Sequence, residues 1–179
     1  TGIQPLNNYL LSNDETFFLH FKQESIYRLP DFISFINPTF AQNFDRSLLK
    51  AFKIRDKGLI ASILRAKILI DSNNINTAFK SLGIELQSRV DEIDKITQEI
   101  KDKKSNYTSS SVIETLGIVK RNFPVDITNL LPSYFQSQIN KIAASINYLQ
   151  LAIYENFDNT QISLDLLSHL LLLNIESVS

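Results

Sequence analysis

Apolar residues recur along this chain at steps of three and four residues, the spacing that gathers side chains on one face of an α-helix. In a stretch expected to be helical over residues 75–104, the apolar line runs through Ile75, Phe79, Leu82, Leu86, Ile93, Ile96 and Ile100. A second line, in a helix expected from Pro132 onward, runs through Phe135, Ile139, Ile142, Ile146, Leu149 and Ile153. Alternating steps of four and three predict shallow-angle packing against a neighbouring helix.

Three more segments have helical patterns. Residues 41–71 predict one long helix, in which Gly58 marks a possible kink or break because glycine weakens a helix interior by about 1 kcal/mol relative to alanine. The Ser-x-x-Glu sequence of Ser111–Glu114 has the form of a capping box and predicts a short helix over 111–122. A last helix starting near Thr160 is apolar around most of its circumference, so we expect it to be the most buried.

The first forty residues differ from the rest. They hold three of the five prolines and six of the twelve phenylalanines. The residues before Pro30 and Pro38 are biased away from helix, which predicts an irregular aromatic arm over residues 1–40. We expect the arm to lie across the helices that follow it.

These elements predict an all-α fold. Its expected form is an up-down-up-down four-helix bundle with one short extra helix and the irregular N-terminal arm. A length of 179 residues suits one domain, which we place at residues 41–179, with the arm at 1–40. With only four glycines and five prolines, the chain lacks the turn signals of a many-stranded sandwich or barrel.

Composition argues against several classes of function. A net charge of −1 is unlike the basic excess of a nucleic-acid-binding protein, and the lack of cysteine excludes disulfides and thiolate chemistry. No apolar run reaches the roughly 18 residues of a membrane span. Neither a glycine-rich phosphate loop nor a Gly-x-Ser-x-Gly elbow is present. We therefore expect no catalytic residues and no cofactor.

The two histidines, His20 and His169, lack a local partner motif. Asp165 and His169 are four residues apart on the last predicted helix, a spacing that suits either a single metal ion or a hydrogen-bonded pair. A structural role is the expectation for both histidines, and no metal site is predicted.

Two surface features favour docking onto a partner. Arg46, Lys50, Lys53 and Lys57 fall on one strip of the predicted helix over 41–71, where repulsion between like charges costs a few tenths of a kcal/mol per pair. A solvated helix face and a landing strip for an acidic partner both fit this pattern. Phe17, Phe18, Phe32 and Phe35 of the arm fit either packing onto the chain's own helices or anchoring in a larger assembly.

Parts of the chain resemble the PsbQ-type extrinsic proteins of photosystem II. The first part is Ile70-Asp71, Asn74-Ile75-Asn76-Thr77, Leu82, Leu86 and Val90, and the second is Ile146-Asn147-Tyr148-Leu149 with Ala152. About 65 of the 179 residues are covered. Ile75 stands where the family usually has tryptophan, and the helix over 111–122 is additional. The resemblance implies a non-enzymatic subunit in the thylakoid lumen that docks on a membrane protein complex and stabilises its oxygen-evolving centre.

Two other interpretations stay open. One is a periplasmic, all-helical ligand-sensing domain of a bacterial transmembrane receptor, in which Arg89, within the apolar line over 75–104, would line a polar pocket. The other is a secreted interaction protein. All three place the chain outside the cytoplasm, and a start at Thr1-Gly2 fits a mature form or a piece of a larger protein.

Overall fold

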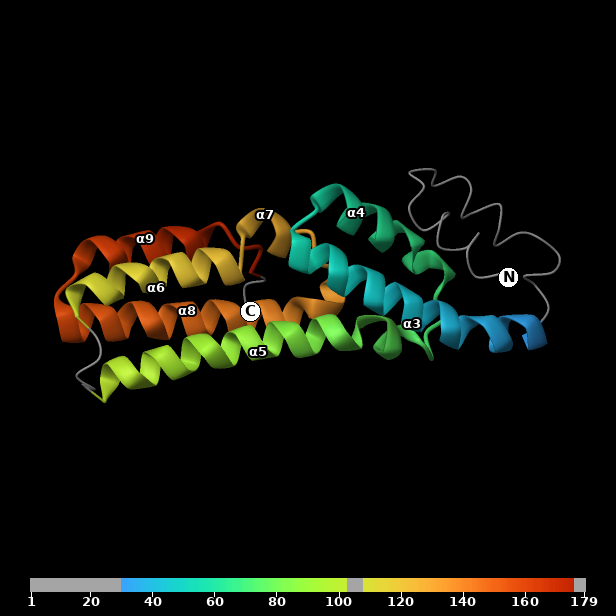
Figure 1. The fold of residues 1–179 in the computed structure, drawn as a ribbon, viewed down its shortest axis with the longest axis horizontal. Coiled ribbons are helices and arrows are strands. Elements are labelled where there is room, and N and C mark those ends of the chain that lie inside the picture. Colours follow the sequence, from blue (N-terminus) through green and yellow to red (C-terminus); the bar gives the residue numbers. More distant parts are fainter. Residues whose placement is uncertain (1–29, 103–107, 176–179) are drawn as a thin grey trace. The chain divides into compact units, whose positions relative to one another are not determined.

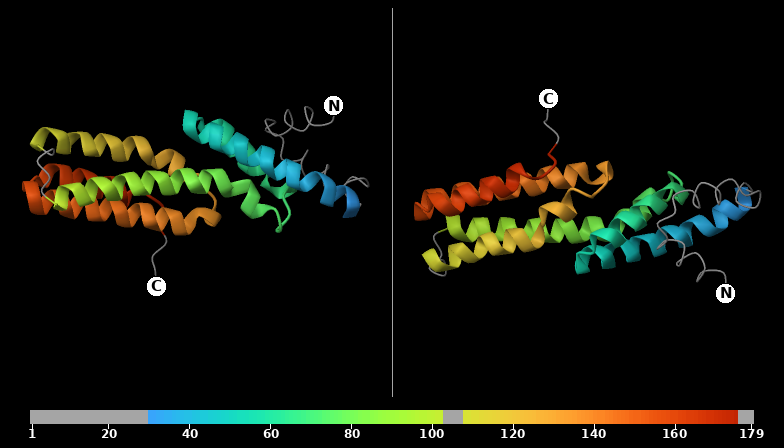
Figure 2. Two further views of the ribbon diagram at one scale, coloured as in Figure 1. Left: turned by 60° about the horizontal axis from the view of Figure 1, so that its bottom comes forward. Right: turned by 90° about the horizontal axis from the view of Figure 1, so that it is seen from above.

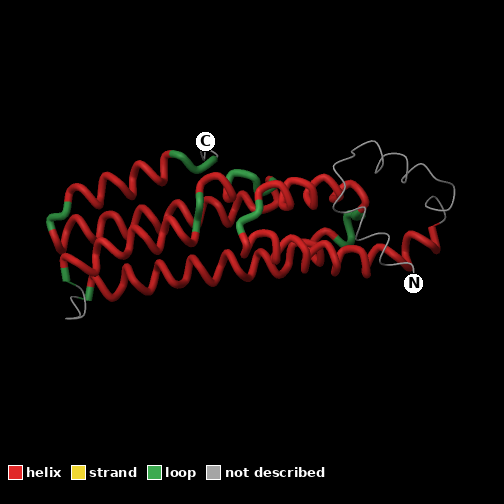
Figure 3. Tube along the Cα trace, turned by 45° about the horizontal axis from the view of Figure 1, so that its top comes forward, coloured by secondary structure: helices red, strands yellow, loops and turns green. Residues whose placement is uncertain are grey.

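The computed structural model describes residues 30–102 and 108–175, and every regular element in these two ranges is a helix (Figure 3). The prediction of an all-α fold is confirmed. The described residues belong to two compact units, one ending at Ile84 and the other beginning at Glu85. Compactness of the units does not test whether the chain unfolds as one domain, so the single domain over 41–179 stays a prediction.

The first unit contains α3 (Pro30–Ile54), α4 (Lys57–Arg65), the 3-10 helix η2 (Ala66–Leu69) and the beginning of α5 (Ile75–Lys101). Helix α4 turns back along α3 (Figure 1). The core of the first unit is formed by fully or almost fully buried apolar side chains, chiefly Phe40, Phe44, Leu48, Phe52, Ile60, Ile63, Phe79 and Leu82.

The long helix predicted over residues 41–71 is wrong, because the chain breaks between α3 and α4. Arg55 takes a left-handed conformation with φ of 58°. Its N–H donates to the Phe52 carbonyl and the Asp56 N–H donates to the Ala51 carbonyl, the two bonds of a Schellman motif. Asp56 then caps α4 by accepting a bond from the Leu59 N–H at 2.9 Å. The break thus precedes Gly58, which lies in the first turn of α4.

The irregular arm predicted for residues 1–40 is wrong over 30–40, which form the first turns of α3. Pro38 lies inside this helix although it has no N–H to donate to the carbonyl four residues earlier. Ser34 and Pro38 are both exposed, so water can hydrogen-bond to that carbonyl. Residues 1–29, the rest of the predicted arm, lie outside the described residues.

Two buried polar side chains join α3 to the rest of the first unit. The Asn37 amide donates to the Leu69 carbonyl at 3.3 Å and accepts from the Asp71 N–H at 3.2 Å. The Asp45 carboxylate accepts from the N–H of Ser81 at 2.8 Å and from its hydroxyl at 2.6 Å. Because buried polar groups are costly unless they are hydrogen-bonded, these contacts fix how α3 packs on η2 and α5.

The second unit contains α5 from Glu85, then α6 (Ser109–Asn122), α7 (Val125–Thr128), η3 (Ser133–Phe135), α8 (Gln136–Phe157) and α9 (Thr160–Leu171). Helices α8 and α9 form a hairpin, and α6 packs on both (Figure 2). The helices predicted near 75–104, 111–122 and from 132 onward are confirmed with shifted ends. Thr108 and Ser111 form the capping box of α6, so the predicted box at Ser111–Glu114 is wrong.

Helix α9 is not the most buried helix, contrary to the prediction from its composition. Leu164 in its first half, Leu171 at its end and Leu172 just beyond it are 51–79 % exposed. Only one side of the helix packs inward, through Ile162, Leu166 and His169. Among the described residues, no helix combines the length and the hydropathy that crossing a membrane requires.

Candidate docking surface

Three of the four cations predicted to form a strip do share one face of α3. Arg46, Lys50 and Lys53 are all exposed. At 100° per residue their side chains fall within an arc of about 60°. Lys57 is exposed too, but it lies on α4 beyond the break, so helical periodicity no longer places it with the others. We call Arg46, Lys50 and Lys53 the basic face.

Asp45, the acidic residue adjacent to Arg46 in the sequence, does not pair with the basic face. Asp45 is buried, and both of its carboxylate oxygens accept hydrogen bonds from Ser81. Within the part of the chain that the structure describes, no hydrogen bond or ion pair holds Arg46 or Lys50. These two exposed cations are therefore open to water and to its dissolved ions.

Phe35 belongs to the same face. Its side chain is 81 % exposed. It precedes Arg46 by eleven residues, which is about three helical turns, so it falls within the arc of the basic face. Sequence reasoning missed this alignment, because the segment before residue 41 was expected to be irregular. The signal was the spacing of Phe35 from the cations, which becomes meaningful only once the helix continues through Pro38.

The structure does not test the other predicted anchors. Phe17 and Phe18 lie outside the described residues, and so does the side chain of Phe32. The side of α3 opposite the basic face is buried through Phe40, Phe44 and Leu48. Among the described side chains, the exposed face is thus polar and basic, with Phe35 near its beginning.

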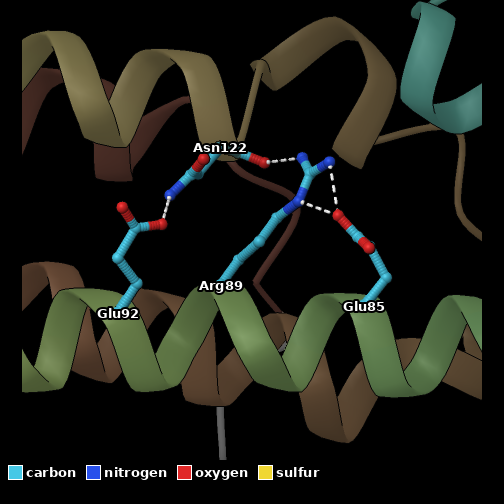
Figure 4. Close-up of polar contacts among 4 residues, drawn as sticks. All are labelled: Glu85, Arg89, Glu92 and Asn122. Atoms are coloured by element: carbon cyan, nitrogen blue, oxygen red, sulfur yellow. Dashed lines mark hydrogen bonds and ion pairs between the residues drawn. The ribbon is translucent and has the colours of Figure 1, made fainter.

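Arg89 lies in a polar cluster between α5 and the end of α6 (Figure 4). Its Nε and Nη2 both lie 2.9 Å from Glu85 Oε1, and its Nη1 donates to the Asn122 carbonyl at 2.6 Å. Asn122 in turn donates to Glu92 Oε2 at 2.7 Å. Because Asn122 is the last residue of α6, its carbonyl has no partner within the helix, and a cation is favourable at this end. Arg89 thus has a structural use.

His169 also binds the end of α6. It is buried, and its Nε2 lies 2.9 Å from the carbonyl oxygen of Phe123. Since a carbonyl oxygen can only accept, Nε2 must carry the proton. Asp165 instead accepts from Gln161 at 3.1 Å. Among the described residues, no three His, Cys, Asp or Glu side chains gather closely enough to hold a metal ion.

Because the pKa of His169 is lowered in the folded chain, we expect the free energy of unfolding to fall as the pH becomes acidic. Burial is the main cause that lowers this pKa from 6.5; the Phe123 carbonyl acts in the opposite direction, and the positive charge of Lys120 lowers it further. The unfolded chain therefore binds more protons than the folded chain just below pH 6.5. The contribution of neutral His169 to the free energy of unfolding is complete above about pH 6.5. It is lost as the pH falls through the pKa of this histidine in the folded state.

We expect the free energy of unfolding to fall more steeply for the wild type than for His169→Gln between pH 7.5 and pH 5. Glutamine keeps an N–H that can donate to the Phe123 carbonyl but does not titrate. Urea unfolding at several pH values measures the difference, and carboxylates common to both proteins cancel. Parallel pH profiles would show that His169 does not titrate differently on folding.

No family model matches the chain, and neither a curated protein nor a solved structure matches it.

Proposed function

We propose that this chain is a non-enzymatic protein that docks onto an acidic protein surface through helix α3. The observation that carries the proposal is the pair of exposed cations Arg46 and Lys50 on the basic face, which no hydrogen bond or ion pair holds within the described residues. Arg46 and Lys50 stay exposed one helical turn apart, while the carboxylate of the adjacent Asp45 accepts hydrogen bonds from Ser81. Like charges at this spacing destabilise an isolated helix by a few tenths of a kcal/mol. An acidic partner would turn that cost into a gain.

The specific partner we propose is the lumenal side of photosystem II. This assignment, with an extracytoplasmic location in the thylakoid lumen, rests on the resemblance of parts of the sequence to PsbQ-type extrinsic subunits. Such a protein would stabilise the oxygen-evolving centre by covering it. The absence of a catalytic role and of a cofactor is part of the same proposal.

The up-down-up-down four-helix bundle is also proposed. It is supported within residues 85–175 by the α8–α9 hairpin, whose turn is Asp158-Asn159, and by α6 packing on both helices (Figure 1). Helices α3 and α4 support it less, because the break at Arg55 divides the segment that would have been one bundle helix.

Arg89 does not favour the receptor interpretation. Arg89, the residue that would have lined a ligand pocket, already binds Glu85 and the carbonyl at the end of α6. A secreted interaction protein remains compatible with docking through α3 and differs from the first proposal only in the partner.

The test is cosedimentation with photosystem II membranes from which the extrinsic subunits have been washed. We expect Arg46→Glu/Lys50→Glu to weaken binding at least tenfold at low salt, because each substitution places a like charge against the acidic surface. The effect should shrink towards 1 M salt, where the Debye length is about 3 Å.

The matched control is Lys95→Glu/Lys141→Glu, which changes the net charge equally at exposed positions on α5 and α8. It should bind like the wild type. Equal weakening in both double variants would reject the basic face and leave a general charge effect. If the wild type does not bind these membranes, the photosystem assignment is rejected.

A further inference from the structure

The exposed face of α3 has two chemically different halves. From Ser34 to Asn43 no residue is charged, and Phe35 is the large exposed apolar side chain. From Arg46 to Lys53 the face is basic. Phe35 and Lys53 are eighteen residues apart, so the face is roughly 27 Å long and only one side chain wide.

We infer that the partner presents an acidic helix that lies along α3, with an apolar side chain against Phe35. The inference rests on the proposed function and names the kind of partner. The cations recur at steps of four and three residues, and carboxylates at the same steps would line one face of a partner helix. Helices packed side by side lie about 8–10 Å apart, which brings such carboxylates within reach of long basic side chains.

Phe35 gives the basic face an apolar contact that fixes the position of a partner helix along α3. Buried aromatic side chains often contribute a large share of the binding energy at interfaces, and exposed ion pairs contribute little. A phenylalanine at one end of a basic strip therefore fixes the register of the partner helix along α3. Moving the partner by one turn would leave either Phe35 or one of the cations without its counterpart.

An anionic membrane surface fits this face less well. A helix that lies in a membrane surface inserts its apolar side among the lipids. The apolar side of α3 is buried in the first unit through Phe40, Phe44 and Leu48. Among the described side chains within the arc of the basic face, Phe35 is the large exposed apolar one, and one phenylalanine gives little apolar area.

The test uses acidic helical peptides with glutamates at steps of four and three and a leucine eleven residues before the first glutamate. Matched peptides carry serine instead of leucine, and reversed sequences cover the opposite helix direction. Fluorescence anisotropy at low salt measures binding to the full chain. We expect Phe35→Ala to weaken binding of a leucine peptide about tenfold, the effect of removing a modest interface anchor, and to leave the serine peptide unchanged.

The outcomes separate this inference from the proposed function. One outcome is that Arg46→Glu/Lys50→Glu weakens peptide binding, while Phe35→Ala affects the leucine and serine peptides equally, in the forward and in the reversed sequences. The register inference then fails, and docking through the basic face stands. If the charge reversal has no effect, the proposed function fails. Binding to phosphatidylglycerol vesicles that depends on Phe35 and exceeds binding to the peptides would overturn the helical partner in favour of lipid.

Discussion

Replacing Phe44 by alanine should lower the free energy of unfolding by roughly 3–5 kcal/mol, the usual cost of deleting a buried phenylalanine ring. Phe44 has no exposed surface, and its ring packs edge to face against Phe79 with centroids 5.6 Å apart and planes at 83°. The substitution removes apolar burial from both helices and leaves a cavity between α3 and α5. Urea unfolding followed by circular dichroism measures the loss.

Phe35→Ala is the matched control for Phe44→Ala, since it makes the same chemical change on the same helix. Phe35 is 81 % exposed, so its loss should change the free energy of unfolding by less than about 0.5 kcal/mol. Similar effects for the two variants would contradict the assignment of Phe44 to the core. The same control shows that the Phe35 variant used in the binding test is folded.

Helices α5 and α8 were predictable because each carries a long line of apolar residues, interrupted in α5 by Arg89 alone, and no proline in its interior. All members of the line in α8, from Phe135 to Ile153, are buried. In α5, Phe79, Leu82, Leu86 and Ile93 are buried likewise. Where local propensity and burial agree in this way, periodicity alone identifies the helix and its inner face.

The break between α3 and α4 was hidden by the same periodicity. Phe52 before the break and Ile63 after it are eleven residues apart, which is helical spacing, although the chain reverses between them. The left-handed position is occupied by Arg55 instead of the usual glycine, so the strongest signal for a helix end is missing. Asp56, a good N-cap residue, was the remaining local signal.

Helix α3 begins earlier than predicted because tertiary packing overrides the preference of proline. Asn37 and Phe40, on either side of Pro38, are both buried, and Asn37 also bonds to the Leu69 carbonyl. These contacts offset the cost of a proline whose missing bond faces water. The same extension places Phe35 on the basic face, whereas Lys57 leaves that face because of the break. The candidate site was thus predicted by residue type, but its geometry depended on both helix ends.

Replacing Phe135 by alanine should also cost roughly 3–5 kcal/mol, and it tests whether the two units unfold together. Phe135 is fully buried in the second unit, where its ring packs edge to face on the ring of Tyr134, with centroids 5.2 Å apart. The boundary between the units falls within α5, between Ile84 and Glu85. Domain boundaries normally fall in exposed linkers, and a helix propagates cooperatively along its length. We therefore expect one cooperative transition.

Hydrogen exchange in low urea distinguishes the two cases. If the chain is one domain, Phe135→Ala lowers the protection of the α3 amides by the same free energy as that of the α9 amides, because both exchange through global unfolding. Tyr154→Ala, at a half-exposed aromatic residue on α8, should leave the protection of the α3 amides and of the α9 amides nearly unchanged. Loss of protection confined to α9 would show two domains that unfold separately. The basic face on α3 would then belong to a unit that keeps its fold, and its partner binding, when the second unit is destabilised.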